Sequence, residues 1–304
     1  MLWFSLIKLA FAKPKVKVLV NKGVDLSIPN AFNSKNPSFF KAKNPKVSYQ
    51  ISDEFKGKIS SGGTCNVPSV NLDIHCTGTH TECIGHIKDT NTFISEACPK
   101  KLISSTLITV HPDSAKTCHE DYYHVPYNKE DLLITEKSLI KAIGSRDDYL
   151  DAIIIRTLPN NLEKKTRNYD ENPAPFFSNN AILYLLDLGV KHLLVDLPSI
   201  DRADDDGQLG NHHLFFRKGQ TISELLYIDE KLQDSEGFLY INTPSRTSKE
   251  QLLDESINAK KPSLDKSLLN ESFTTAFVIS ERVRSINALA LSAYLLNPPV
   301  KASG

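Results

Sequence analysis

Three short runs of apolar and β-branched residues divide the middle of the chain. Residues 102–110 are apolar and β-branched, which predicts a strand. Residues 151–157 and 191–196 hold continuous apolar runs, which are typical of strands buried on both faces. The hydrophobic pattern therefore predicts at least these strands in the core.

Two other segments carry the hydrophobic period of a helix. Residues 129–143 have this period and end near Gly144, and residues 179–188 have it and stop at Gly189. A strand, a helix and a further strand follow one another in this part of the chain. That order predicts an α/β arrangement.

The N-terminal part predicts shorter elements. Residues 16–20 alternate apolar and polar side chains, and residues 25–29 follow as a second short strand. Residues 30–46 are rich in Asn, Pro and Lys and predict a loop, and residues 60–63 predict a turn. Residues 71–74 alternate again, which predicts a strand that leads into the next segment.

Composition and charge narrow the class of protein. The chain has 304 residues and equal numbers of basic and acidic residues, 36 of each, which argues against nucleic acid or an anionic membrane as its main partner. Its five cysteines form no CxxC pair and suit a reducing compartment, so we expect a cytoplasmic protein. Residues 1–12 lack the basic start and the long apolar run of a secretory signal. No stretch reaches the roughly 20 apolar residues of a membrane span.

The chemistry is concentrated in residues 71–87. Imidazole, carboxylate and thiolate are the usual ligands of zinc and its neighbours, and buried together without a metal they would lack partners. In an extended stretch His80 and Glu82 point to the same side, and Gly78 would allow a tight turn. A polar loop with surface histidines is the alternative. The segment holds His75, Cys76, His80, Glu82, Cys83 and His86.

The run Thr77-Gly78-Thr79-His80-Thr81-Glu82, followed by His86, resembles the His-Thr-Gly-Thr-His-x-Asp-x-Pro-x-His signature of the cyclase-like metal-dependent hydrolases. That family includes bacterial kynurenine formamidase and isatin hydrolase. Three positions depart from the signature. Glu82 replaces an Asp, Ile84 replaces the Pro, and Cys76 stands at the first His, with His75 one residue earlier.

A second pair of residues strengthens the resemblance. His212 is followed twelve residues later by Glu224, as in the family. Residues 195–201 resemble the family's Asp-x-Pro-Ser-x-Asp element, whose acids are expected to orient loops and ligands rather than bind metal. The alternative for His212 is a helix cap or a surface position.

The resemblance implies a swivelling β/β/α hydrolase domain with a mixed sheet. It covers residues 24–243, so we assign residues 1–243 to this domain, with 1–23 as a divergent lead. Residues 244–304 are then a connector and a helical arm, because 244–271 are rich in Lys, Ser and Asp, and 273–296 are apolar and compatible with a helix. A homo-oligomer is expected.

The implied metal ligands are His75, His80, Glu82, His212 and Glu224, with Cys76 as the competitor of His75. They would hold one or two divalent ions per chain, zinc in preference to manganese.

The implied activity is arylformamidase-like, as in tryptophan catabolism. Metal-activated water would cleave an N-formyl aryl amide or a cyclic amide, with His86 as the base. An aromatic small-molecule substrate would suit a pocket formed by Phe39, Phe40, Phe176 or Phe177. A lactone hydrolase and a metal-binding protein without activity are the alternatives.

Overall fold

The computed structural model describes residues 23–32, 34–99, 101–216, 219–243 and 276–277. Its centre is a six-stranded mixed sheet in the order β12-β5-β8-β10-β11-β4. The inner strands β5 (Ile103–Val110), β8 (Ala152–Thr157), β10 (His192–Val195) and β11 (Thr221–Glu224) are parallel. The edge strands β12 (Glu236–Leu239) and β4 (His80–Glu82) are antiparallel to their neighbours. The predicted α/β class and mixed sheet are confirmed.

The sheet is buried on both faces, which explains its continuous apolar runs. In β8, Ile153 and Ile155 belong to one buried cluster, whereas Ala152 and Ile154 belong to another on the opposite face. Successive residues of a strand point to opposite faces, so each position here meets a core. Because both faces of the sheet are buried, residues 152–155 are apolar at successive positions and do not alternate with polar residues.

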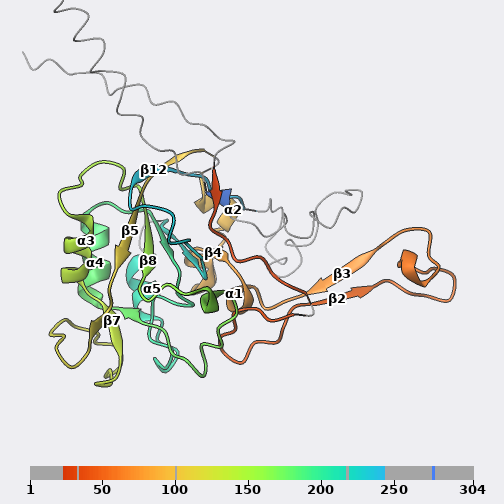
Figure 1. Ribbon diagram of the computed structural model, residues 1–304, viewed down its shortest axis with the longest axis horizontal. Coiled ribbons are helices and arrows are strands. Elements are labelled where there is room, and N and C mark those ends of the chain that lie inside the picture. The colour runs from red at the N-terminus through yellow and green to blue at the C-terminus, as the bar shows by residue number, and fades with distance from the viewer. Residues whose placement is uncertain (1–22, 33, 100, 217–218, 244–275, 278–304) are drawn as a thin grey trace, which may run out of the picture.

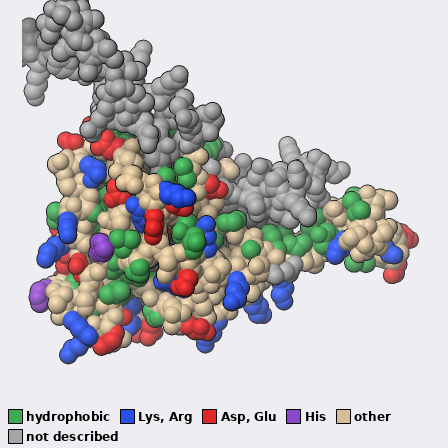
Figure 2. Space-filling view, viewed as in Figure 1, with side chains coloured by type: hydrophobic (Ala, Val, Ile, Leu, Met, Phe, Trp, Pro, Cys, Tyr) green, Lys and Arg blue, Asp and Glu red, His purple; other side chains and the backbone are tan. Residues whose placement is uncertain are grey.

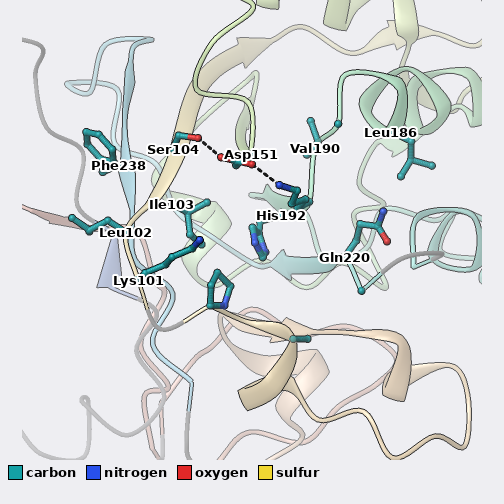
Figure 3. A pocket seen from close by; sticks show the side chains of 15 residues that line it. Lys101, Leu102, Ile103, Ser104, Asp151, Leu186, Val190, His192, Gln220 and Phe238 are labelled. Atoms are coloured by element: carbon teal, nitrogen blue, oxygen red, sulfur yellow. Dashed lines mark hydrogen bonds and ion pairs between the residues drawn. The ribbon is translucent and has the colours of Figure 1, made fainter. Parts of the chain in front are cut away.

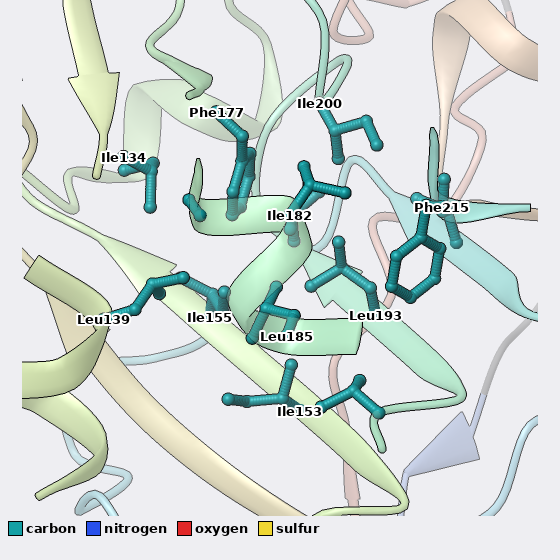
Figure 4. Packing of buried hydrophobic residues seen from close by; sticks show 14 of the residues in the cluster. Ile134, Leu139, Ile153, Ile155, Phe177, Ile182, Leu185, Leu193, Ile200 and Phe215 are labelled. Atoms are coloured by element: carbon teal, nitrogen blue, oxygen red, sulfur yellow. The ribbon is translucent and has the colours of Figure 1, made fainter. Parts of the chain in front are cut away.

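Helices α3 (Glu136–Ile143), α4 (Asn179–Asp187) and α5 (Gly210–Phe215) contribute to the larger of these two clusters. Figure 4 shows Leu139, Leu185 and Phe215 from these helices close to Ile155 and Leu193 of the sheet. Figure 1 shows α3 and α4 side by side on one side of the sheet. Gly189, at φ 80°, follows α4, so the predicted stop at this glycine is confirmed.

The predicted helix over residues 129–143 is wrong in its first half. Residues 132–134 form strand β7 (Leu132–Ile134), which pairs with β6 (Asp113–Ser114) and β9 (Phe176–Phe177). Leu133 and Ile134 are fully buried in these contacts. The helix begins only after Thr135, whose side chain accepts a hydrogen bond from the backbone N–H of Ser138.

A long hairpin projects from the body of the molecule (Figure 1). It consists of β2 (Lys46–Tyr49) and β3 (Pro68–Asn71), with the short helix η2 (Ile59–Ser61) near its tip. Gly62, at φ 86°, confirms the turn predicted over 60–63. Ile51 and Ile59 are exposed on this hairpin. A homo-oligomer stays a prediction.

Other predictions for the ends of the chain have mixed outcomes. Within residues 25–29 only Asp25 lies in a strand, as the last residue of β1 (Val24–Asp25), which pairs with β13 (Ala276–Phe277). The helix predicted over 273–296 is therefore wrong at residues 276–277, and its remainder lies outside the described residues, as does the strand predicted over 16–20.

The charges on the surface and the lengths of the helices concern two partners that the sequence argued against, nucleic acid and a membrane. Figure 2 shows Lys and Arg side chains interspersed with Asp and Glu side chains, without one large patch of either sign on this face. In the described part of the chain, none of the helices has the length and apolarity needed to cross a membrane.

Candidate metal centre

Two segments that lie far apart in the sequence meet at one edge of the sheet. Strand β4 pairs with β11 so that His80 lies opposite Glu224, the last residue of β11. The helical turn α1 (Ile74–Thr77) precedes β4 and supplies His75, and η3 (Ile84–His86) follows it and supplies His86. His212 comes from α5. All six predicted site residues are therefore brought together, by one strand pairing and three short helical elements.

The alternation of β4 directs two of these side chains to the same place. His80 and Glu82 are both buried, while the hydroxyl of Thr81 between them makes a 2.7 Å hydrogen bond with Ser223 instead. This is the arrangement expected for alternate residues of a strand.

Glu82 is the centre of the cluster. Its Oε2 lies 3.1 Å from His75 Nδ1 and 3.5 Å from His86 Nε2. Its Oε1 lies 2.7 Å from His212 Nε2. Two sets of potential metal ligands have their donor atoms within 4.8 Å of one another, His75, Glu82 and His86 in one and His80, Glu82 and Glu224 in the other. Glu82 is the residue that the two sets share.

His80 presents a buried nitrogen without a hydrogen bond to any residue that the structure describes. Its Nδ1 lies 3.0 Å from the carbonyl oxygen of Gly78, which fixes the ring. Its Nε2 lies 3.5 Å from Glu224 Oε2, and among the described residues it has no hydrogen-bond partner. Buried polar atoms in folded proteins are nearly always paired. The unpaired Nε2 beside two carboxylates therefore fits a metal ligand, whose other ring nitrogen is typically held by a carbonyl or carboxylate.

His212 is oriented in the same way. Its Nδ1 lies 2.7 Å from Asp201 Oδ2, and Asp201 also accepts hydrogen bonds from the backbone N–H groups of Asn211 and His212. This leaves Nε2 directed toward Glu82 and Glu224, at 2.7 and 3.5 Å. Asp201 thus lies where the sequence expected an orienting acid.

Asp196, the other acid of residues 195–201, lies in a separate buried network. It accepts hydrogen bonds from Thr157 and Lys164. No sequence signal distinguishes Lys164 from the lysines around it.

Charges in the centre are strongly coupled. Burial alone would lower the pKa of His212, but Glu82, Asp201 and Glu224 outweigh it and raise that pKa well above its usual value. Burial would likewise raise the pKa of Glu82, yet His212, His75 and His86 hold it well below its usual range. The centre therefore keeps a buried carboxylate that the positive charge of neighbouring imidazoles stabilises. A divalent cation bound by imidazole and carboxylate would supply such a charge as well.

His75 and Cys76, the two competing candidates, both lie on α1. The expected strand over 71–74 therefore ends at Asn71, the last residue of β3. The geometry still directs His75 to Glu82. Burial raises the pKa of the Cys76 thiol to about 11, with Asp73 and Glu224 adding to the shift.

Gly78 has a different role from the predicted tight turn. Its φ of −167° is ordinary extended backbone. A Cβ atom there would come within 2.6 Å of Asn30 Oδ1, so the glycine permits the close approach of residue 30 to the metal segment.

Several other predicted site residues lie elsewhere. Phe176 and Phe177 form β9 and are buried in the core, so they cannot line an open pocket. Phe39 is buried against Tyr169 and Leu225, and Phe40 is largely exposed.

Comparisons with known proteins place the chain in a family and relate its fold to solved structures. The family model described as "Putative cyclase" matches residues 24–202, more than half of the chain. The fold is similar to that of isatin hydrolase A from Labrenzia aggregata bound to benzyl benzoate, with 15% sequence identity and a TM-score of 0.50 over 71% of this chain and 84% of that one. A predicted metal-dependent hydrolase from Bacillus stearothermophilus has 17% identity and a TM-score of 0.48, over 74% of this chain and 90% of that one. No curated protein matches the chain.

Proposed function

Because the chain belongs to the cyclase family, we propose that it is a metal-dependent hydrolase that cleaves an amide-type bond in a small molecule. The observation that carries this proposal is the buried, unpaired Nε2 of His80 between Glu82 and Glu224. The similar fold of isatin hydrolase A, a hydrolase of the small molecule isatin, supports this substrate class.

The residues that would hold the metal are His75, His80, Glu82, His212 and Glu224. We propose zinc in preference to manganese, and one or two ions, since Glu82 belongs to both ligand sets. When bound, such an ion supplies an activated water molecule and an electrophilic contact for a carbonyl oxygen.

His86 is the proposed general base. Two imidazoles of the centre are open to solvent, His75 at 45% and His86 at 26% exposed, whereas those of His80 and His212 are buried. With His75 assigned to the metal, His86 is the accessible imidazole that is left for the substrate. Burial lowers the pKa of His86, more than Glu82 raises it, which keeps the ring neutral near pH 7. A neutral imidazole can take a proton at Nε2 and return it to the leaving nitrogen.

The loop that follows β10 holds the centre in place. The backbone N–H of Ile200 donates a 3.0 Å hydrogen bond to Glu224 Oε1, and Asp201, the next residue, orients His212. Both contacts fix the carboxylate and the imidazole before any substrate arrives. Such preorganisation of the residues around a metal supports its affinity and activity.

Within this class we propose an arylformamidase-like reaction on an N-formyl aryl amide or a cyclic amide. The experiment is turnover of the zinc- or manganese-loaded protein on a panel of N-formyl aryl amides, cyclic amides and lactones. Faster turnover of amides is expected. Turnover of lactones alone would make it a lactone hydrolase, and metal binding without any turnover would contradict hydrolysis.

Substitution of His86 tests its role as the base. His86→Ala should keep the metal and lower kcat by roughly 10²–10⁴-fold, the usual contribution of a general base. His119→Ala, in an exposed loop outside the centre, is the matched control and should leave kcat unchanged. Loss of metal in His86→Ala to the extent seen in His80→Ala would make His86 a ligand instead.

A further inference from the structure

A pocket opens at the end of the parallel strands opposite to the metal centre. It lies at the amino ends of the parallel strands, and it is lined by residues at or just before their starts, among them Ser104, Asp151, His192 and Gln220. Gln220 precedes β11, whereas Glu224 of the metal centre ends it. The pocket has a volume of about 800 Å³, within the range of small-molecule sites. Nothing in the proposed hydrolysis uses it.

The charged groups of this pocket leave one positive charge uncompensated. Asp151 accepts hydrogen bonds of 2.6 Å from Ser104 Oγ and 2.8 Å from Lys191 Nζ, so its carboxylate is already paired (Figure 3). Lys101 lines the same pocket and forms no ion pair with any residue that the structure describes. Two lysines against one aspartate give the lining a net charge of +1. The pocket therefore favours an anion.

His192 supplies a buried polar group. It is only 4% exposed, and its Nδ1 lies 2.8 Å from Thr221 Oγ1, which leaves Nε2 available to a ligand. The pKa of His192 is lowered to about 4, mainly by burial; Asp151 opposes this shift, and Lys191 and Lys101 add to it. The ring is therefore neutral at pH 7, and its tautomer can adapt to donate a hydrogen bond at Nε2. Figure 3 shows the Lys101 side chain reaching toward this ring.

The remaining wall is largely apolar. Ile103, Leu186, Val190 and Phe238 line the pocket beside the polar groups. Apolar walls with a few placed polar groups are typical of sites for organic molecules rather than for inorganic ions.

We propose that this pocket binds a small organic carboxylate. The ammonium group of Lys101 pairs with the carboxylate, His192 Nε2 donates to it, and Ile103, Val190 and Phe238 contact the apolar body. Loss of a hydrogen bond to a charged group weakens binding on the order of tenfold or more, so the charge of Lys101 has a measurable effect.

Isothermal titration of the full chain with benzoate tests this site. Benzoate should bind, and benzyl alcohol, its uncharged counterpart, should bind on the order of tenfold or more weakly. Lys101→Gln should weaken the binding of benzoate by a similar factor. Because Lys101 is exposed, its substitution should not disturb the core. Lys116→Gln, at another exposed lysine, is the matched control and should bind benzoate as the parent does.

A variant of the metal centre shows whether benzoate binds in this pocket or at the metal centre. His80→Ala should retain the benzoate affinity of the parent, because His80 lies opposite Glu224 at the carboxyl end of β11, whereas the pocket lies at the amino ends of the strands. The proposal is overturned if benzoate gives no binding, if Lys101→Gln binds as the parent does, or if His80→Ala abolishes binding.

Discussion

Removal of the Lys164 ammonium should destabilise the protein far more than removal of an ordinary lysine. Its Nζ donates to the carbonyl oxygen of Thr157 at 2.7 Å, to Thr157 Oγ1 at 2.9 Å and to Asp196 Oδ2 at 2.7 Å. Lys164 is 3% exposed and Asp196 is fully buried. Lys164→Met therefore leaves a buried carboxylate without its cation. The loss of one partner of a buried pair costs about 3–5 kcal/mol.

Urea unfolding of the metal-free protein, followed by circular dichroism, measures this cost. Lys137→Met, at an exposed lysine of α3, is the matched control and should change the unfolding free energy by less than about 0.5 kcal/mol. Lys164→Met with Asp196→Asn should recover much of the loss, since the uncompensated charge is then gone. A Lys164→Met protein within about 1 kcal/mol of the parent would refute the reasoning, because it would mean that Asp196 needs no cation.

Three further predictions concern the imidazole groups. Asp201→Asn should weaken zinc affinity about 10–100-fold in equilibrium dialysis, because the Asp201 carboxylate orients the His212 ring through Nδ1. An unchanged zinc affinity would contradict this role of Asp201. His75→Ala should weaken zinc binding at least as much, whereas Cys76→Ser should leave it unchanged, and the reverse result would make the thiolate the ligand. The pKa of His192 is about 4 in the folded chain against 6.5 as its ordinary value. The unfolded chain therefore takes up the proton first as pH falls from 6.5 to 4, and the unfolding free energy should drop by about 3 kcal/mol. The unfolding free energy of the parent minus that of His192→Gln should show this drop when it is measured from pH 6.5 to pH 4. A difference that does not change with pH would contradict the prediction.

Buried strands were the part of the fold that the sequence predicted best. Both faces of β8 meet apolar clusters, one through residues 152 and 154 and the other through residues 153 and 155. Every position of this run must therefore be apolar. The helix α4 was found for a similar reason, since its buried face recurs with helical period and Gly189 ends it at positive φ. These signals are local and strong.

Strand β7 was missed because its environment is not local. Leu132, Leu133 and Ile134 have the hydrophobicity of a helix as well as of a strand, and pairing with β6 and β9 decides between them. The start of α3 was hidden as well, because the N3 residue opposite the Thr135 cap is Ser138 rather than the usual Glu or Gln.

The metal residues were predicted from chemistry and resemblance, but their arrangement was not. His80 meets Glu224 through the register of β4 against β11, across well over a hundred residues of chain. Lys164 itself lies in no motif, and Glu163 and Lys165 beside it are also charged, so only the fold shows that the residue between them is buried. Long-range register and selective burial are properties of the tertiary structure.

Metal content is the most direct test of the account. After reconstitution with zinc or manganese and removal of free ions, the protein should retain at least one divalent ion per chain by plasma mass spectrometry. His80→Ala and Glu224→Ala should each lower that occupancy, because His80 Nε2 and the Glu224 carboxylate face the same buried space. A fully folded protein that retains neither metal would contradict the central claim.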